Sequence, residues 1–229
     1  MPDDQTKPSS TERPAEAWSD EPSGVARVTR KRPKPGERRV QILQALASML
    51  EQPGAERITT AALAARLSVS EAALYRHFAS KAQMFEGLIE FIEQSVFTLV
   101  NQIAEREQGS IAGDAAAGAR HAGKLITMLL QFAEKNPGMT RVMVGDALVF
   151  ENERLQQRMN QFFDKIEATL RQGLRASTDA AGSATPSVDT QVLASALSAF
   201  AVGRLHRFAR SGFKRSPTEH LEASLALMF

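Results

Sequence analysis

The sequence predicts an all-α protein with a three-helix head at residues 36–82 and a larger helical body at residues 83–229. Apolar residues recur every three or four positions through most of the chain after residue 36, the period of helices buried on one face. Residues 58–81 contain two short helical stretches joined by a tight turn, with a third helix beginning at their end. At 229 residues the chain can bury a sizeable core as one ordinary domain or two small ones.

Composition and motifs exclude several classes of function. The chain has no cysteine, which rules out disulfides and thiolate metal sites, and no apolar run approaches the roughly 20 residues that span a bilayer. The N-terminus lacks the apolar segment of a signal peptide, so we expect a cytoplasmic protein. We find no phosphate-binding, dinucleotide-binding or nucleophile-elbow motif, and the four histidines are scattered. The sequence therefore predicts a protein that is not an enzyme and uses neither a metal nor a cofactor.

Residues 1–35 are predicted to be a disordered tail that ends in a basic arm. Six of the ten prolines lie here and apolar residues are scarce. The first part is acidic, and from Arg27 onward the charge becomes basic and includes Arg32 and Lys34. A basic arm of this kind can follow the phosphates of DNA or enter its minor groove, whereas a solvated linker is the alternative.

The first firm helix is predicted at residues 37–50, and the turn motif follows it. An apolar stripe that includes Ile42, Leu46 and Leu50 marks that helix, and Gln52-Pro53-Gly54 stops it. In the motif, Thr59 and Ser70 are predicted to cap two short helices, the second running over residues 71–78. Ser68 stands where the tight turn usually has glycine, and a positive φ costs another residue up to about 1–2 kcal/mol. Either Ser68 tolerates this conformation or the turn differs a little.

The second short helix has the features of a helix that enters a DNA major groove. Small residues in its first turns, Ala72 and Ala73, allow its N-terminal end to approach base edges closely. Other side chains are candidates for phosphate or groove contacts. The complete set of candidate DNA-binding residues is Thr59, Thr60, Ser70, Ala72, Ala73, Tyr75, His77, Lys81, Arg32 and Lys34.

The body is predicted to consist of helices separated by short breaks. A capping pattern at Ser80–Gln83 opens a helix that runs to about residue 107, and a second occupies residues 113–135. Residues 139–151 are apolar and predicted to form one or two buried helices, which either fill the core or line a ligand cavity. Two further helices, at about 151–175 and 189–211, flank a low-complexity loop at 176–188.

Residues 58–81, ITTAALAARLSVSEAALYRHFASK, resemble the helix-turn-helix of TetR-type regulators, with Tyr75, His77, Phe78 and Lys81 as the characteristic ending. This resemblance covers about residues 37–229. The segments SEAALYRHF, LIEFIE, NPGMTR and RLQQRMNQFFDKIEATLRQ are similar to the nucleoid occlusion factors within that family. The resemblance implies a nucleoid-associated homodimer on a near-palindromic site in double-stranded DNA, which antagonises ring assembly by the tubulin-like division protein FtsZ.

The same resemblance implies two protein-binding surfaces. The FtsZ-facing surface would include Phe91, Met128, Lys135 and Asn136, although Leu99 stands where the relatives carry a charge. The implied dimer interface is built from Leu155, Met159, Phe162, Phe163, Ile166, Leu170, Ala196, Ala199, Phe200 and Gly203. The alternative function is a TetR-type transcriptional repressor that a small molecule releases from DNA. A partly polar cavity around Met128, Met143 and Phe150 would favour the repressor, and a filled core would favour division inhibition.

Overall fold

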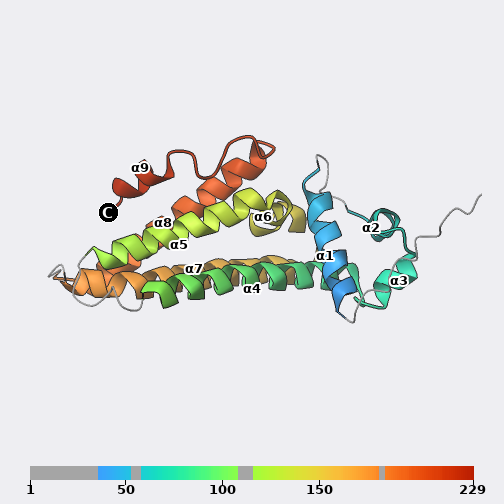
Figure 1. The fold of residues 1–229 in the computed structure, drawn as a ribbon, viewed down its shortest axis with the longest axis horizontal. Coiled ribbons are helices and arrows are strands. Elements are labelled where there is room, and N and C mark those ends of the chain that lie inside the picture. Colours follow the sequence, from blue (N-terminus) through green and yellow to red (C-terminus); the bar gives the residue numbers. More distant parts are fainter. Residues whose placement is uncertain (1–35, 53–57, 108–115, 181–183) are drawn as a thin grey trace, which may run out of the picture. The chain divides into compact units, whose positions relative to one another are not determined.

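The computed structural model describes residues 36–52, 58–107, 116–180 and 184–229, and every regular element in those ranges is a helix (Figure 1). The all-α prediction is therefore confirmed. The elements in order are α1 (Glu37–Leu50), α2 (Thr60–Arg66), α3 (Glu71–Tyr75), α4 (Lys81–Glu107), α5 (Ala117–Lys135), α6 (Pro137–Met143), the 3-10 helix η2 (Asp146–Leu148), α7 (Glu153–Ala180), α8 (Pro186–Arg210) and α9 (Leu221–Ala226).

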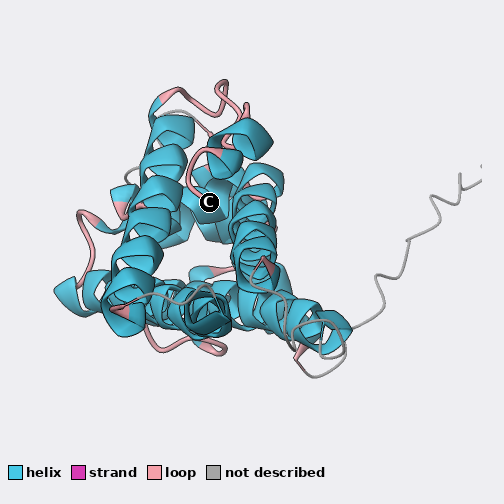
Figure 2. Ribbon diagram, turned by 90° about the vertical axis from the view of Figure 1, so that its left-hand side faces the viewer, coloured by secondary structure: helices cyan, strands magenta, loops and turns pink. Residues whose placement is uncertain are grey.

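Long helices packed along one another build the body. Helix α7 packs along α5 and α8, and α4 lies beside both α5 and α7 (Figures 1 and 2). Helices α1, α2 and α3 lie together at one end of these long helices, with α1 in contact with α4 and α6. None of the described helices combines the length and the apolar character needed to cross a bilayer.

The buried side chains of head and body belong to one hydrophobic cluster. In the head, Leu46, Leu63 and Phe78 are almost completely buried, and they join the same cluster as Leu88 of α4 and Leu197 of α8. The expected boundary at residues 82 and 83 falls inside α4, a continuous helix of 27 residues. The head therefore shares its core with the body.

At one glycine the head and the body meet without room for a side chain. Gly138 lies in the first turn of α6, where a Cβ atom would stand only 1.8 Å from the backbone carbonyl oxygen of Ala47 in α1. No side chain fits at that distance, so the backbones of α1 and α6 meet directly. Gly138 therefore has a packing role in the structure.

Helix α3 is shorter than predicted. It ends at Tyr75 with Arg76 as its C-cap, whereas the sequence suggested a helix to residue 78. The amides of His77 and Phe78 both donate to the Leu74 carbonyl, which turns the chain back toward the body. This turn places the Phe78 ring in the core, 1% exposed and against Gly87.

Other expectations also need correction at the boundaries. The expected loop at 176–188 is partly helical, since α7 extends to Ala180 and α8 begins at Pro186, a residue suited to the first turn of a helix. Val149 and Phe150, expected in a buried segment, are 67% and 60% exposed because they follow η2 at the surface. Helix α9 was not predicted, since its six residues lack a long apolar period.

Candidate nucleic-acid interface

Two hydroxyl groups cap the short helices of the head as the sequence predicted. Thr59 is the N-cap of α2, and its Oγ1 accepts a hydrogen bond of 3.1 Å from the amide of Ala62. Ser70 caps α3 in the same way, accepting at 3.3 Å from Ala73. Both hydroxyls satisfy amides that the first turn of a helix leaves without a partner. The two caps fix where each short helix starts.

In the turn between α2 and α3, Ser68 tolerates the positive φ, which was the first of the two alternatives that the sequence left open. Ser68 has a φ of 53°, one of three residues other than glycine with a positive φ in the described chain. The amides of Ser68 and Val69 donate to carbonyls at the end of α2, which compensates part of this strain. The turn therefore keeps the tight geometry although serine replaces the usual glycine.

A chain of hydrogen bonds connects the first turns of α2 and α3. The Tyr75 hydroxyl donates at 3.4 Å to Thr60 Oγ1, and the Thr60 hydroxyl donates at 2.5 Å to the carboxylate of Glu71. Tyr75 is 44% exposed although it carries a large ring, and Glu71 is also exposed. The structure brings Thr60 and Tyr75 together as candidate DNA contacts. Glu71, the first residue of α3, joins them.

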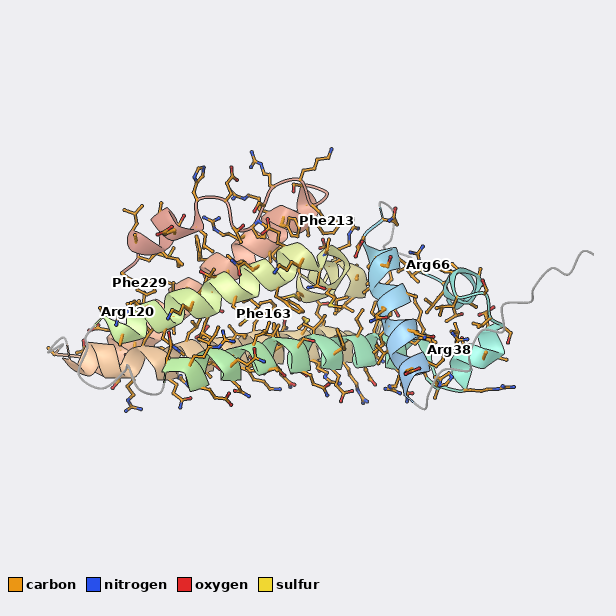
Figure 3. All side chains as sticks on the ribbon, in the orientation of Figure 1. Arg38, Arg66, Arg120, Phe163, Phe213 and Phe229 are labelled. Atoms are coloured by element: carbon orange, nitrogen blue, oxygen red, sulfur yellow. The ribbon has the colours of Figure 1, made fainter. Side chains whose placement is uncertain are left out.

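Arginines of the head hold the backbone around this face. Arg39 donates from Nη1 to the His77 carbonyl at 3.1 Å, and its guanidinium lies 4.2 Å from the centre of the Phe78 ring. Arg66 at the end of α2 donates to Ser48 of α1 at 2.8 Å. Figure 3 shows Arg38 and Arg66 among the side chains of α1 and α2. These contacts keep positive charge close to the helix-turn-helix.

Lys81 forms a contact that the sequence did not suggest. Its ammonium group, at the start of α4, pairs with the carboxylate of Glu151 just ahead of α7. A phosphate contact by Lys81 would therefore compete with this ion pair.

Ser80 accepts a hydrogen bond from the amide of Gln83, and the Gln83 side chain accepts one from the Ala79 amide, which confirms the capping pattern at the start of α4.

The remaining candidates for DNA contact lie in several settings. His77 and Ala72 are exposed and Ala73 is half-buried, all within or beside α3. Arg32 and Lys34 lie outside the described residues. In the described part of the chain no group of three or more histidine, aspartate or glutamate side chains is placed to hold a metal ion.

The candidate partner residues lie on the neighbouring helices α4 and α5. Phe91 and Met128 are half-buried and pack against the core, while Lys135 is exposed at the end of α5. Asn136 is half-buried, and its side-chain amide donates to the Phe132 carbonyl at 2.7 Å. Lys135 is therefore the most accessible of the four, and a partner would reach only part of Phe91 and Met128.

Half of the residues predicted for the dimer interface are buried within a single chain. These five are at most 5% exposed and belong to its core: Leu155, Met159, Phe162, Ile166 and Leu170. Phe163 is half-buried and packs edge-on against Phe162. The sequence pattern was correct in finding a seam along α7, but its partner helices are α5 and α8 of the same chain.

Helix α8 carries an open stripe of small and apolar residues. Ala196, Ala199 and Gly203 are exposed and Phe200 is half-buried. Val188 and Val192 continue this side of the helix, at 59% and 62% exposure. A Cβ at Gly203 would meet nothing within 4 Å in the single chain. Small and apolar residues spaced by three or four positions allow another helix to approach closely.

Residues 139–151, expected to fill a core or line a ligand cavity, are partly buried and partly exposed. Val142 and Met143 are buried in the core, whereas Phe150 projects from the surface. Two hollows of about 370 and 400 Å³ lie elsewhere, one between α7 and α8 beside Arg171 and Thr190, the other between α5 and α9 beside Gln131 and Leu225. Neither is lined by Met128, Met143 or Phe150.

Two family models match the chain. Residues 42–88 match the bacterial regulatory proteins of the tetR family, and residues 120–229 match a tetracyclin repressor-like, C-terminal domain of the SlmA-like type. The chain is 51% identical over 197 residues to the nucleoid occlusion factor SlmA of Aliivibrio fischeri, covering 86% of this chain and 96% of that protein. It is 50% identical to SlmA of Vibrio cholerae, covering 83% and 93%.

Solved structures with the same fold are more distant in sequence. The transcriptional regulator FadR from Bacillus subtilis, in complex with stearoyl-CoA, superposes with a TM-score of 0.64 at 14% identity, covering 82% of this chain and 96% of that one. NalD of Pseudomonas aeruginosa, the secondary repressor of a multidrug efflux pump, gives 0.61 at 21% identity, covering 84% and 94%. At these identities the likeness establishes the fold alone.

Proposed function

We propose that this chain, which belongs to the SlmA family of nucleoid occlusion factors within the TetR-type proteins, binds specific chromosomal sites as a dimer and antagonises FtsZ ring assembly over the nucleoid. The observation that carries this proposal is the identity of about one half along 96% of a named nucleoid occlusion factor. The fold alone would not decide, since it is shared with a regulator solved with an acyl-CoA.

The head supports DNA binding by its local geometry. Helix α3 starts with small and polar residues and exposes Tyr75, so its first turn is accessible to a major groove. Thr60 and Tyr75 present hydroxyl groups at the same face, and such groups bind phosphates and base edges. We expect two such heads to read half-sites about one DNA turn, roughly 34–36 Å, apart.

The stripe on α8 is the proposed dimer surface. It is apolar or small at Val192, Ala196 and Ala199, and it lies open in the single chain. A two-fold axis through such a stripe would pair α8 with its copy, because the same patch then covers itself. The five buried residues of α7 would support this surface from behind without touching the partner.

FtsZ is the proposed partner, and the exposed side of α4 and α5 is its proposed surface. Lys135 offers an accessible positive charge, and Phe91 offers part of an aromatic ring. The experiment is sedimentation of FtsZ polymers with the purified full-length chain, with and without a DNA duplex that the chain selects from a random pool. We expect less pelleted FtsZ in the presence of the chain, and a larger loss when the duplex is added.

Matched variants separate the partner surface from general damage to the fold. Phe91→Ala and Lys135→Ala should reduce FtsZ antagonism and spare DNA binding. Phe97→Ala removes another half-buried ring from α4, and Lys124→Ala removes another exposed lysine from α5, so these two should retain antagonism. Full antagonism by both Phe91→Ala and Lys135→Ala would exclude the proposed surface. No effect of the native chain on FtsZ, together with specific DNA binding, would favour a ligand-released repressor.

A further inference from the structure

We propose that Glu71 is a positioning residue for DNA recognition, which holds the Thr60 and Tyr75 hydroxyls at the DNA-facing surface and lowers the affinity for non-cognate duplexes. This inference rests on the proposed DNA-binding function. It concerns how the helix-turn-helix binds its cognate DNA sequence with higher affinity than other sequences.

The hydrogen bonds that carry the inference run in one direction. Tyr75 donates to Thr60, and Thr60 donates to Glu71, so the carboxylate is the final acceptor. Thr60 belongs to the first turn of α2, whereas Glu71 and Tyr75 belong to α3. The carboxylate therefore ties the two helices together on their exposed side, in addition to the contacts in the core. In this arrangement each of the two hydroxyls is oriented by the bond that it donates.

The negative charge of Glu71 lowers the affinity for DNA, whereas its hydrogen bond favours cognate binding. Non-specific binding to DNA is mostly attraction between basic side chains and phosphates. An exposed carboxylate on the face presented to the duplex repels those phosphates wherever the protein lands. Specific binding also uses the contacts of Thr60 and Tyr75, which depend on the orientation that Glu71 maintains. Glu71 thus lowers the affinity for non-cognate duplexes by repulsion, whereas on the cognate duplex the contacts that it orients outweigh that repulsion.

The test measures affinities of the full-length chain for two duplexes, one selected by the wild-type chain from a random pool and one with the same composition in scrambled order. For Glu71→Ala we expect cognate affinity to fall about tenfold through loss of a charge-assisted hydrogen bond. Non-cognate affinity should rise about fivefold at low salt, because a repulsive charge near phosphate is removed. That rise should shrink at high salt, where the interaction is screened.

Glu71→Gln keeps an acceptor for Thr60 but removes the charge. It should therefore restore much of the cognate affinity that Glu71→Ala loses, while keeping the increased non-cognate affinity. Glu222→Gln is the matched control, since it removes an exposed carboxylate from the first turn of α9 and should change neither affinity. Thermal unfolding of each variant checks that the fold is kept.

The outcomes distinguish this inference from the function on which it rests. An unchanged ratio of cognate to non-cognate affinity in Glu71→Ala would overturn the inference, as would a Glu71→Gln variant no better than alanine on the cognate duplex. If the wild-type chain selects no duplex at all, the proposed DNA-binding function fails first. A merely structural role for Glu71 would lower both affinities together and leave their ratio unchanged.

Discussion

Replacing Gly138 with alanine tests the direct contact between head and body. The added Cβ would lie 1.8 Å from the carbonyl oxygen of Ala47 and 2.8 Å from its carbonyl carbon. Real Cβ atoms are essentially never found closer than 3.0 Å to such atoms, so the two backbones must separate by at least the difference, 1.2 Å. Since the obstacle is backbone, no change of side-chain rotamer can relieve it.

The free energy of this separation can be bounded from packing. A radial gap of about 0.5–1 Å already removes a quarter to a half of each van der Waals contact. Ala47 lies at the contact between α1 and α6, and both Ala47 and Met139 of α6 are only 7% exposed. We expect Gly138→Ala to lower the free energy of unfolding by about 2 kcal/mol or more, within the usual range for overpacking. For a chain of this size that corresponds to a fall in Tm of roughly 4–8 °C.

The assay is urea and thermal unfolding of the native chain, Gly138→Ala and a matched variant, Gly123→Ala. Gly123 lies inside α5, where a Cβ would make ordinary contacts of 3.7 Å with Phe229 and 3.8 Å with Leu225. Alanine there should raise stability by up to about 1 kcal/mol through helix propensity. A Gly138→Ala chain as stable as the native one would refute the claim that the two backbones are in direct contact.

Three further changes test other parts of the molecule. Tyr75→Ala should weaken DNA binding in a mobility-shift assay yet leave the mass of the dimer unchanged; normal affinity would exclude α3 as the reading helix. Ala199→Arg places a long cation in the open stripe of α8 and should yield monomers in sedimentation, whereas an intact dimer would move the interface elsewhere. Burial raises the pKa of Glu93, but hydrogen bonds from Lys165 and Arg158 and their charges outweigh it and hold the pKa below its ordinary value of 4.5. A carboxyl with a lowered folded-state pKa contributes stability above its unfolded pKa, and this is lost as pH falls through the folded value. Glu93→Gln should therefore reduce stability at neutral pH and flatten its fall in acid; an unchanged acid limb would show that the ion pairs contribute nothing.

Local signals predicted the head well. Thr59 and Ser70 are N-caps, and Ser68 has the positive φ expected of the turn, because these features depend on neighbours a few residues away. The end of α3 was missed because the burial of Phe78, a tertiary effect, decides where the helix stops. The bond from Thr60 to Glu71 joins residues 11 positions apart and leaves no periodic trace in the sequence.

Periodicity alone could not assign the partner of a buried helix face. The stripe of α7 that includes Phe162 and Ile166 has the spacing of a helix seam, and a seam has the same pattern whether its partner lies in the same chain or in another. Only the exposure of Ala199 against the burial of Ile166 separates the two cases. The role of Gly138 was hidden for a related reason, since a glycine beside proline already has a sufficient local explanation in the turn.

The shared core has a consequence for exchanging parts between relatives. Phe78 of the head packs against Gly87, which belongs to α4, and Gly138 meets α1 backbone to backbone. A chimera joined at residue 82 would take Phe78 and α1 from one relative, and Gly87 and Gly138 from the other. Each contact would then be formed between residues of two different proteins. To transplant DNA specificity, an engineer would have to move the first two turns of α4 and the start of α6 together with residues 36–82. For protein engineering, the head is therefore one unit with its supporting helices rather than a separate cassette.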